Sequence, residues 1–115
     1  MIEADIYGAV SARVQGRLYP DVAPLGVALP YATYQQVGGD AVNFLTGVSD
    51  KRNGIFQFYV WSETRDQTAQ IIRQIEDTVK TSPLLNAVSM GGSVSIYEPA
   101  TLLYGAHQDF SIWFS

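Results

Sequence analysis

The chain has 115 residues, a usual length for one domain, and 47% of its residues are hydrophobic while 16% are charged. This composition predicts a folded domain and excludes an intrinsically disordered chain. Seven basic residues against eleven acidic ones give a net charge of -4, and the basic residues are scattered along the sequence. Nucleic-acid-binding domains concentrate cations, so we expect no specific nucleic acid binding. The absence of cysteine excludes disulfide bonds, thiolate metal sites and cysteine nucleophiles.

The first residues, 1–5, are acidic and lack the basic start and the apolar run of a signal peptide. No apolar stretch approaches the roughly 18 residues that a membrane span needs. We therefore expect one domain over residues 1–115 that is made in the cytosol and contacts no membrane.

A first helix is predicted over residues 2–14. Ile2, Ile6, Val10 and Val14 recur at every fourth position, which places one apolar stripe on one helix face. Gly16 is the expected helix end.

Three prolines follow between residues 16 and 30, and they argue against a regular strand or helix there. Because this stretch is too apolar for a solvated linker, we expect an irregular segment packed across the body of the domain.

Two strands are predicted next, at residues 31–37 and 55–61. Gly38-Gly39 indicates a bulge or a break after the first strand, and residues 41–45 are a candidate continuation. Asn53-Gly54 is a strong hairpin-turn signal. Both faces of residues 55–61 are apolar, which is typical of a strand covered on both sides. The second cover would come from the proline-rich segment or from a neighbouring subunit.

A second helix begins after Thr64, which forms a capping box with Gln67, and ends before Pro83. Ile71, Ile72, Ile75 and Val79 form its buried stripe. Residues 87–98, which contain a bulge or turn at Gly91-Gly92, and residues 104–114 are the last two strands. The expected fold is α+β: a mainly antiparallel sheet of four to five strands with two helices packed on it, in the order helix, strand, strand, helix, strand, strand.

One trio of residues invites a catalytic interpretation: His107, Asp109 and Ser111 share a face of the last strand. A catalytic triad requires the histidine to contact both partners. Four residues along a strand span about 13 Å, so His107 is too far from Ser111 to act as its base. Polar residues on a terminal strand are the preferred interpretation.

Other candidate sites are equally weak. Asp40 and Asp50 lie on the long loop after the first strand, where they form either a cation site or, in our preferred interpretation, part of a solvated loop. The diglycines lack the lysine of a phosphate-binding loop. Glu76 and Asp77 are adjacent on a helix and point in different directions. We expect no catalytic, cofactor-binding or metal-binding residues, hence no cofactor and no enzyme activity.

The loop before Asn53-Gly54 is the best candidate for a functional element. It is polar, contains glycine and is long for a hairpin, so we expect a mobile assembly loop that orders on contact. The alternative is a loop without a function. The candidate residues are Thr46, Gly47, Val48, Ser49, Asp50, Lys51, Arg52 and Asn53.

Four blocks of the sequence resemble one protein family. They are residues 1–7 (Met-Ile-Glu-Ala-Asp-Ile-Tyr), 17–24 (Arg-Leu-Tyr-Pro-Asp-Val-Ala-Pro), 28–35 (Ala-Leu-Pro-Tyr-Ala-Thr-Tyr-Gln) and 109–113 (Asp-Phe-Ser-Ile-Trp). In this order they resemble the prophage tail-completion proteins, which are grouped with the tail-terminator and tail-to-head joining proteins of long-tailed phages. The resemblance covers nearly the whole chain and includes no catalytic motif.

The resemblance implies a structural subunit of the virion tail, assembled in the bacterial cytoplasm. Such subunits form a ring, typically of six copies and in some cases only on docking, at the end of the tail tube. The ring stops tube polymerisation and joins the head, so the implied partners are other copies of the chain, the tube protein and the head-tail connector proteins, with DNA passing through the lumen. The alternatives are another virion morphogenesis part, such as a head-completion adaptor or tube component, and a module that binds a small ligand or peptide.

Overall fold

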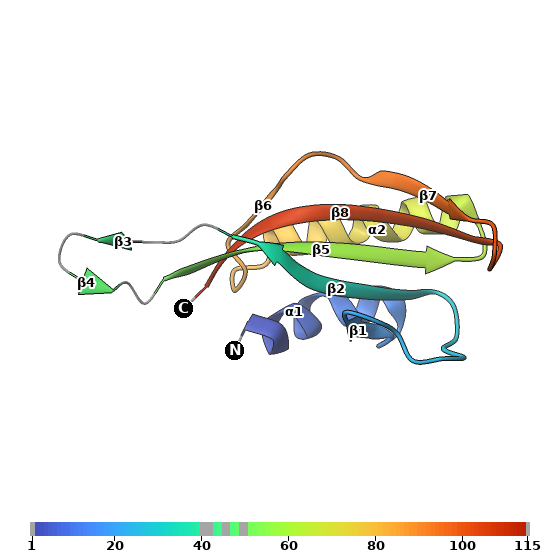
Figure 1. Cartoon of the computed structure of the whole chain (residues 1–115), viewed down its shortest axis with the longest axis horizontal. Helices are drawn as coiled ribbons and strands as arrows, with labels where there is room; N and C mark the ends of the chain where they lie inside the picture. Colours follow the sequence, from blue (N-terminus) through green and yellow to red (C-terminus); the bar gives the residue numbers. More distant parts are fainter. Residues whose placement is uncertain (1, 40–42, 45–46, 49–50, 115) are drawn as a thin grey trace.

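The computed structural model of the chain describes residues 2–39, 43–44, 47–48 and 51–114. Its body has two layers, a twisted sheet and a layer of helices against one face (Figure 1). The helices are α1 (Ile2–Val10), continued by the 3-10 helix η1 (Ser11–Val14), and α2 (Arg65–Thr81). The strands are β1 (Leu18–Pro20), β2 (Tyr31–Gly38), β3 (Asn43–Phe44), β4 (Gly47–Val48), β5 (Arg52–Ser62), β6 (Ala87–Ser89), β7 (Val94–Glu98) and β8 (Leu103–Phe114).

The main sheet has six strands, in the order β1-β2-β5-β8-β6, and β7 pairs with β8 beside β6. The pairing of β1 with β2 is parallel and the others are antiparallel. The α+β class with two helices is therefore confirmed, whereas the expected four- to five-stranded sheet is corrected to a mixed sheet of six strands. The break at Gly91-Gly92 divides one expected strand into β6 and β7, because both halves pair with the same long partner.

The proline-rich region also differs from the expectation. Leu18–Pro20 forms a parallel edge strand, which tolerates Pro20 because a strand end at a sheet edge needs no further N–H donor. Residues 21–29 are irregular, as expected, but they pack loosely: Val22 is 74% exposed and Leu25 is fully exposed. A cavity of about 510 Å³ separates this segment from Trp61 on the helix-free face of the sheet. The second cover of β5 is thus incomplete.

The core lies between the helices and one face of the sheet. Alternate residues of β5 and β8 point into it, and Phe58 and Phe110 meet edge to face at 5.7 Å with no exposed surface. From the helices, Ile6 and Val10 of α1 and Ile75 of α2 are fully buried. The four-residue apolar stripe of the first helix and the stripe of the second are therefore confirmed.

Thr64 caps α2 as the sequence predicts, because its side chain accepts a hydrogen bond from the backbone N–H of Gln67 at 3.1 Å. The prediction of a turn at Asn53-Gly54 is wrong. Both residues lie inside β5, where they pair with Trp113 and Ile112 of β8. The twelve residues of β8 provide backbone partners along the whole of β5, so ladder pairing outweighs the local turn preference.

Tyr34 joins α1 to the sheet through a hydrogen bond from its hydroxyl to the Glu3 carboxylate at 3.2 Å. Burial, followed by the nearby charge of Glu3, raises the pKa of Tyr34 from 10.0 to about 12. The unfolded chain therefore loses this proton first as the pH rises. The stabilisation is complete below pH 10 and disappears as the pH passes through about 12.

We expect the free energy of unfolding to fall more steeply between pH 10 and 12 in the parent protein than in Tyr34→Phe, which has no proton to lose. Urea unfolding followed by circular dichroism across this range measures the difference. Equal pH dependences of the free energy of unfolding in the two proteins would contradict the raised pKa of Tyr34. A phenolate absorbance that appears only near pH 12 in the parent protein and is absent from Tyr34→Phe would support it.

Candidate functional site

The segment expected to be an assembly loop, residues 46–53, is described only in part. Gly47 and Val48 form β4, while Arg52 and Asn53 begin β5. Thr46, Ser49 and Asp50 lie outside the described residues. Asn53 is 7% exposed, and its side-chain amide donates to the Ser111 hydroxyl at 2.8 Å, so this residue serves the sheet rather than a surface. Its role in assembly and that of its neighbours remain predictions.

Strands β3 and β4 form a separate hairpin. Asn43 pairs with Val48 and Phe44 with Gly47 in a two-stranded sheet that is distinct from the main sheet. Figure 1 shows this hairpin beyond the ends of β2 and β5, projecting from one end of a molecule whose longest extent is 53 Å. Isolated two-stranded hairpins are marginally stable in water, so a second surface would stabilise this one.

Gly39 fixes the point where β2 leaves the main sheet. Its φ is +155°, and a β-carbon placed there would lie 2.2 Å from the backbone oxygen of Asn53 in β5. No other residue allows so close an approach of the two backbones. The register shift between Gln36 and Gly38 confirms the predicted irregularity at the diglycine.

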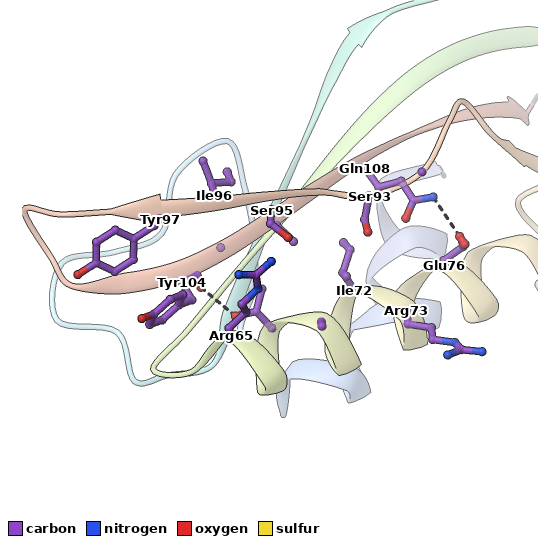
Figure 2. Close-up of a pocket in the computed structure, with 15 residues that line it drawn as sticks. Arg65, Ile72, Arg73, Glu76, Ser93, Ser95, Ile96, Tyr97, Tyr104 and Gln108 are labelled. Carbon is purple, nitrogen blue, oxygen red and sulfur yellow. Dashed lines mark hydrogen bonds between the residues drawn. The ribbon is translucent and has the colours of Figure 1, made fainter.

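A groove lies at the other end of the molecule, between α2 and β7. Its volume is about 650 Å³. Residues 65–76 of α2 line one wall, residues 92–97 the other and residues 104–108 of β8 the floor (Figure 2). We call this site the α2–β7 groove. Ile72 and Ala106 make part of it apolar, and the hydroxyls of Ser93 and Ser95 add hydrogen-bonding groups.

Two arginines of α2, Arg65 and Arg73, give the α2–β7 groove positive charge on its helical side. Figure 2 shows Arg65 extending toward Ser95 and Arg73 pointing outward. In the part of the chain that the structure describes, neither arginine has an ion pair or a hydrogen bond from its side chain. They are available to an anionic partner.

The two ends of the α2–β7 groove are lined by different side chains. At one end, the rings of Tyr97 and Tyr104 lie with their centroids 4.9 Å apart, and Tyr97 is 47% exposed. At the other, the buried Gln108 amide donates to the Glu76 carboxylate at 3.1 Å and to the Gly91 carbonyl at 3.0 Å. Gln108 thus satisfies Glu76 and anchors the connection between β6 and β7, which leaves the arginines as the unpartnered charged groups of the lining.

His107, Asp109 and Ser111 lie on the helix-free face of β8, opposite Tyr59, Gln57 and Ile55 of β5. His107 packs against the ring of Tyr59 with centroids 5.1 Å apart. Among the described residues, no hydrogen bond joins the trio, and one carboxylate oxygen of Asp109 is buried without a partner. Their positions fit aromatic and polar packing on a strand rather than a nucleophile with its base.

The described chain contains no cluster of three or more His, Asp or Glu side chains that would suit a metal ion. None of its described helices combines the length and the apolarity needed to cross a membrane.

Sequence reasoning did not find the α2–β7 groove. In the sequence, Arg65 and Arg73 are two of the scattered basic residues, Ile72 belongs to the buried stripe of a helix, and Tyr97 and Tyr104 belong to two strands. The available signal was the pair of tyrosines on either side of the turn after β7, which a hairpin brings face to face. The pairing of α2 with this hairpin requires the tertiary structure.

Comparison with known proteins gave one family. The sequence model of the family described as Tail completion protein gp17 matches residues 7–115. No curated protein matches the chain. The family match spans every strand of the main sheet, α2 and the C-terminal part of α1, from residue 7 onward.

Proposed function

Because the chain belongs to the tail completion protein gp17 family, a family of structural phage-tail proteins, we propose that it forms a ring at the end of the tail tube. The ring stops polymerisation of the tube protein and presents the surface that joins the head. The observation that carries this proposal is the family match over residues 7–115. The broader role, completion of a phage tail as a component of the virion tail, follows from the family itself.

The shape of the subunit supports a ring. The hairpin of β3 and β4 projects from one end, and β7 and the start of α2, which line the α2–β7 groove, lie toward the other (Figure 1). Two different surfaces on one subunit suit heterologous contacts, which close into a ring when the rotation between neighbours permits. Exposed apolar side chains at Val88, Met90, Val94 and Leu102 provide further area for partners.

The proposed partners are other copies of the chain, the tail tube protein and the head-tail connector proteins. The net charge of -4 suits a lumen that DNA passes without binding. The proposal assigns the chain no catalytic step. The contact of His107 with Tyr59 supports this, since it places the one histidine in an aromatic stack rather than against a nucleophile.

Tube assembly tests the proposed function directly. Purified tail tube protein is allowed to polymerise with and without the chain, and tube length and tube ends are imaged by electron microscopy. We expect the chain to shorten the tubes in proportion to its concentration and to add a ring of density at one end.

Mass measurement over a concentration series, with and without tubes, gives the number of subunits in the ring. The proposal would be contradicted if the chain kept the mass of one subunit in the presence of tubes and the tube ends stayed bare. Saturable binding of a small ligand by such a monomer would favour the ligand-binding alternative instead.

A further inference from the structure

Helix α2 and strand β8 run side by side along the α2–β7 groove, and two side-chain contacts relate their positions. The Thr68 hydroxyl donates to the Tyr104 carbonyl at 2.9 Å, and the Gln108 amide donates to the Glu76 carboxylate at 3.1 Å. The helical pair is eight positions apart and the strand pair four. Eight helical residues rise about 12 Å and four strand residues about 13 Å. A strand that lies along the groove therefore passes four residues for every eight of α2.

Strand β7 has an edge that an added strand would cover. Its partner is β8, and among the described strands its outer edge is unpaired. Its sequence, Val-Ser-Ile-Tyr-Glu, contains no lysine or proline, the residues that commonly protect an exposed edge, and its one charged residue is the last. Val94 and Tyr97 of this strand are each about half exposed. A strand paired with this edge would satisfy its backbone groups and reduce the exposure of both side chains.

Arg65, Ala69 and Arg73 stand at successive fourth positions of α2, so they share the helix face that lines the groove. The two arginines are eight positions apart and therefore match strand positions i and i+4, which point to one face with i+2 between them. Ala69 lies midway on the helix, and its short side chain leaves room for a larger apolar one (Figure 2). The matching segment has carboxylates at i and i+4 and an apolar residue at i+2.

The chain itself contains no such segment, because none of its eleven acidic residues is four positions from another. Neither its own residues nor those of a second copy therefore match the groove. Nucleic acid is also disfavoured, since the lining contains the carboxylate of Glu76 and the chain has a net charge of -4. The occupant that fits is an acidic segment of a different protein.

We propose that the α2–β7 groove binds an extended acidic segment of another protein, which adds as a strand to the open edge of β7. Two of its carboxylates, four positions apart, pair with Arg65 and Arg73, and an apolar side chain between them fills the space over Ala69. This inference goes beyond the proposed ring, because it rests on the groove alone.

Two synthetic peptides of identical composition test the spacing. The first, fluorescein-Ser-Glu-Thr-Leu-Thr-Glu-Ser-amide, has its glutamates four positions apart with leucine midway. The second, fluorescein-Ser-Thr-Glu-Leu-Glu-Thr-Ser-amide, has them two positions apart and on the opposite strand face from leucine. Each is titrated with the whole chain at low salt, and the fluorescence anisotropy is measured. We expect the first peptide to bind about tenfold more tightly or better. Equal affinities, or binding of neither peptide, would overturn the proposal.

Arg73→Glu tests the charge, and Lys80→Glu is its matched control. Both positions are exposed on α2 and both substitutions reverse one charge, but Lys80 does not line the groove. We expect Arg73→Glu to weaken binding of the first peptide about tenfold, and Lys80→Glu to weaken it less than about twofold. Equal losses would show that binding follows net charge alone and would overturn the site.

A rescue experiment separates lost contacts from lost folding. The double variant Arg65→Glu/Arg73→Glu is titrated with a peptide in which lysines replace the two glutamates of the first. We expect this pair to bind, whereas the lysine peptide should not bind the parent chain. A double variant that is folded by circular dichroism and binds neither peptide would contradict the assigned contacts.

Hydrogen exchange with the first peptide locates the added strand. We expect slower exchange of the amides of β7 and no change in β1, the edge strand on the other side of the sheet. Unchanged exchange in β7 would overturn the strand pairing. Equal binding of oligothymidylate would favour nucleic acid and overturn the proposal, as would full competition by glutarate, which has carboxylates but no backbone. These measurements need no tail tubes, so the groove and the proposed ring can fail independently.

Discussion

Replacing Phe58 with Ala is expected to lower the free energy of unfolding by about 3–5 kcal/mol. The side chain is fully buried, so its removal loses the free energy of transferring the ring out of water and also leaves a cavity in the core. Phe58 also loses its edge-to-face contact with Phe110 and its tilted contact with the ring of Tyr34 at 6.1 Å. Since native domains are stable by only about 5–15 kcal/mol, much of the folded population would disappear on mild heating. Urea unfolding followed by tryptophan fluorescence measures the change.

Tyr59 provides the matched control for Phe58. It is the next residue of β5, points to the opposite face of the sheet and is only half-buried. Tyr59→Ala should cost less than about half as much, because it removes less buried area and leaves no closed cavity. If the two substitutions cost the same, the helix-free face would be as tightly covered as the core, contrary to the structure.

The substitution Gly39→Ala is expected to destabilise the protein by about 2–4 kcal/mol and to reduce tube capping with it. The added methyl group would stand 2.2 Å from the Asn53 carbonyl oxygen, and this oxygen belongs to the backbone of β5 and has little room to move. The chain leaving β2 must then shift away from β5, which redirects the hairpin. Chemical unfolding and the tube-length assay measure the two effects.

Gly8→Ala is the control for this substitution. A β-carbon at Gly8, within α1, has no neighbour within 4 Å. Alanine there should leave tube capping intact and raise the free energy of unfolding by about 0.5–1 kcal/mol, since glycine is unfavourable inside a helix. Gly39→Ala behaving like Gly8→Ala would show that the close approach to β5 does not position the hairpin.

The two faces of the sheet explain the apolar pattern on both sides of residues 55–61. One face carries the core with the helices. The other carries Tyr59, Trp61 and His107, and Trp61 lies so close over Gly105 that a β-carbon there would stand 2.6 Å from its ring. Aromatic rings packed along the sheet thus replace a second layer of helices on this face.

The sequence by itself determined the elements whose signals are local. The apolar stripes of α1 and α2, the cap at Thr64 and the alternation along β8 each rest on residues within four positions of one another. The family resemblance, carried by blocks from the first helix to the last strand, also lay in the sequence and is shown by the match over residues 7–115.

The tertiary structure alone decided which strands are neighbours. The Asn53-Gly54 pair is a strong turn signal, yet it lies within β5, because pairing with the distant β8 outweighs a two-residue preference. Leu18–Pro20 pairs with β2 although its composition argues against a strand. Of the expected assembly loop, Arg52 and Asn53 pair with the distant β8, whereas Gly47 and Val48 pair with the neighbouring β3.

The α2–β7 groove could not be predicted from the sequence, since it exists only where α2, β7 and β8 meet. Arg65 and Tyr97, which lie on its opposite walls, are separated by more than thirty positions, and no local pattern relates them. Local periodicity specifies which face of an element is buried, whereas long-range pairing specifies what that face and its neighbours enclose. The sequence therefore determined the type of protein and most of its elements, and the fold decided where its contact surfaces lie.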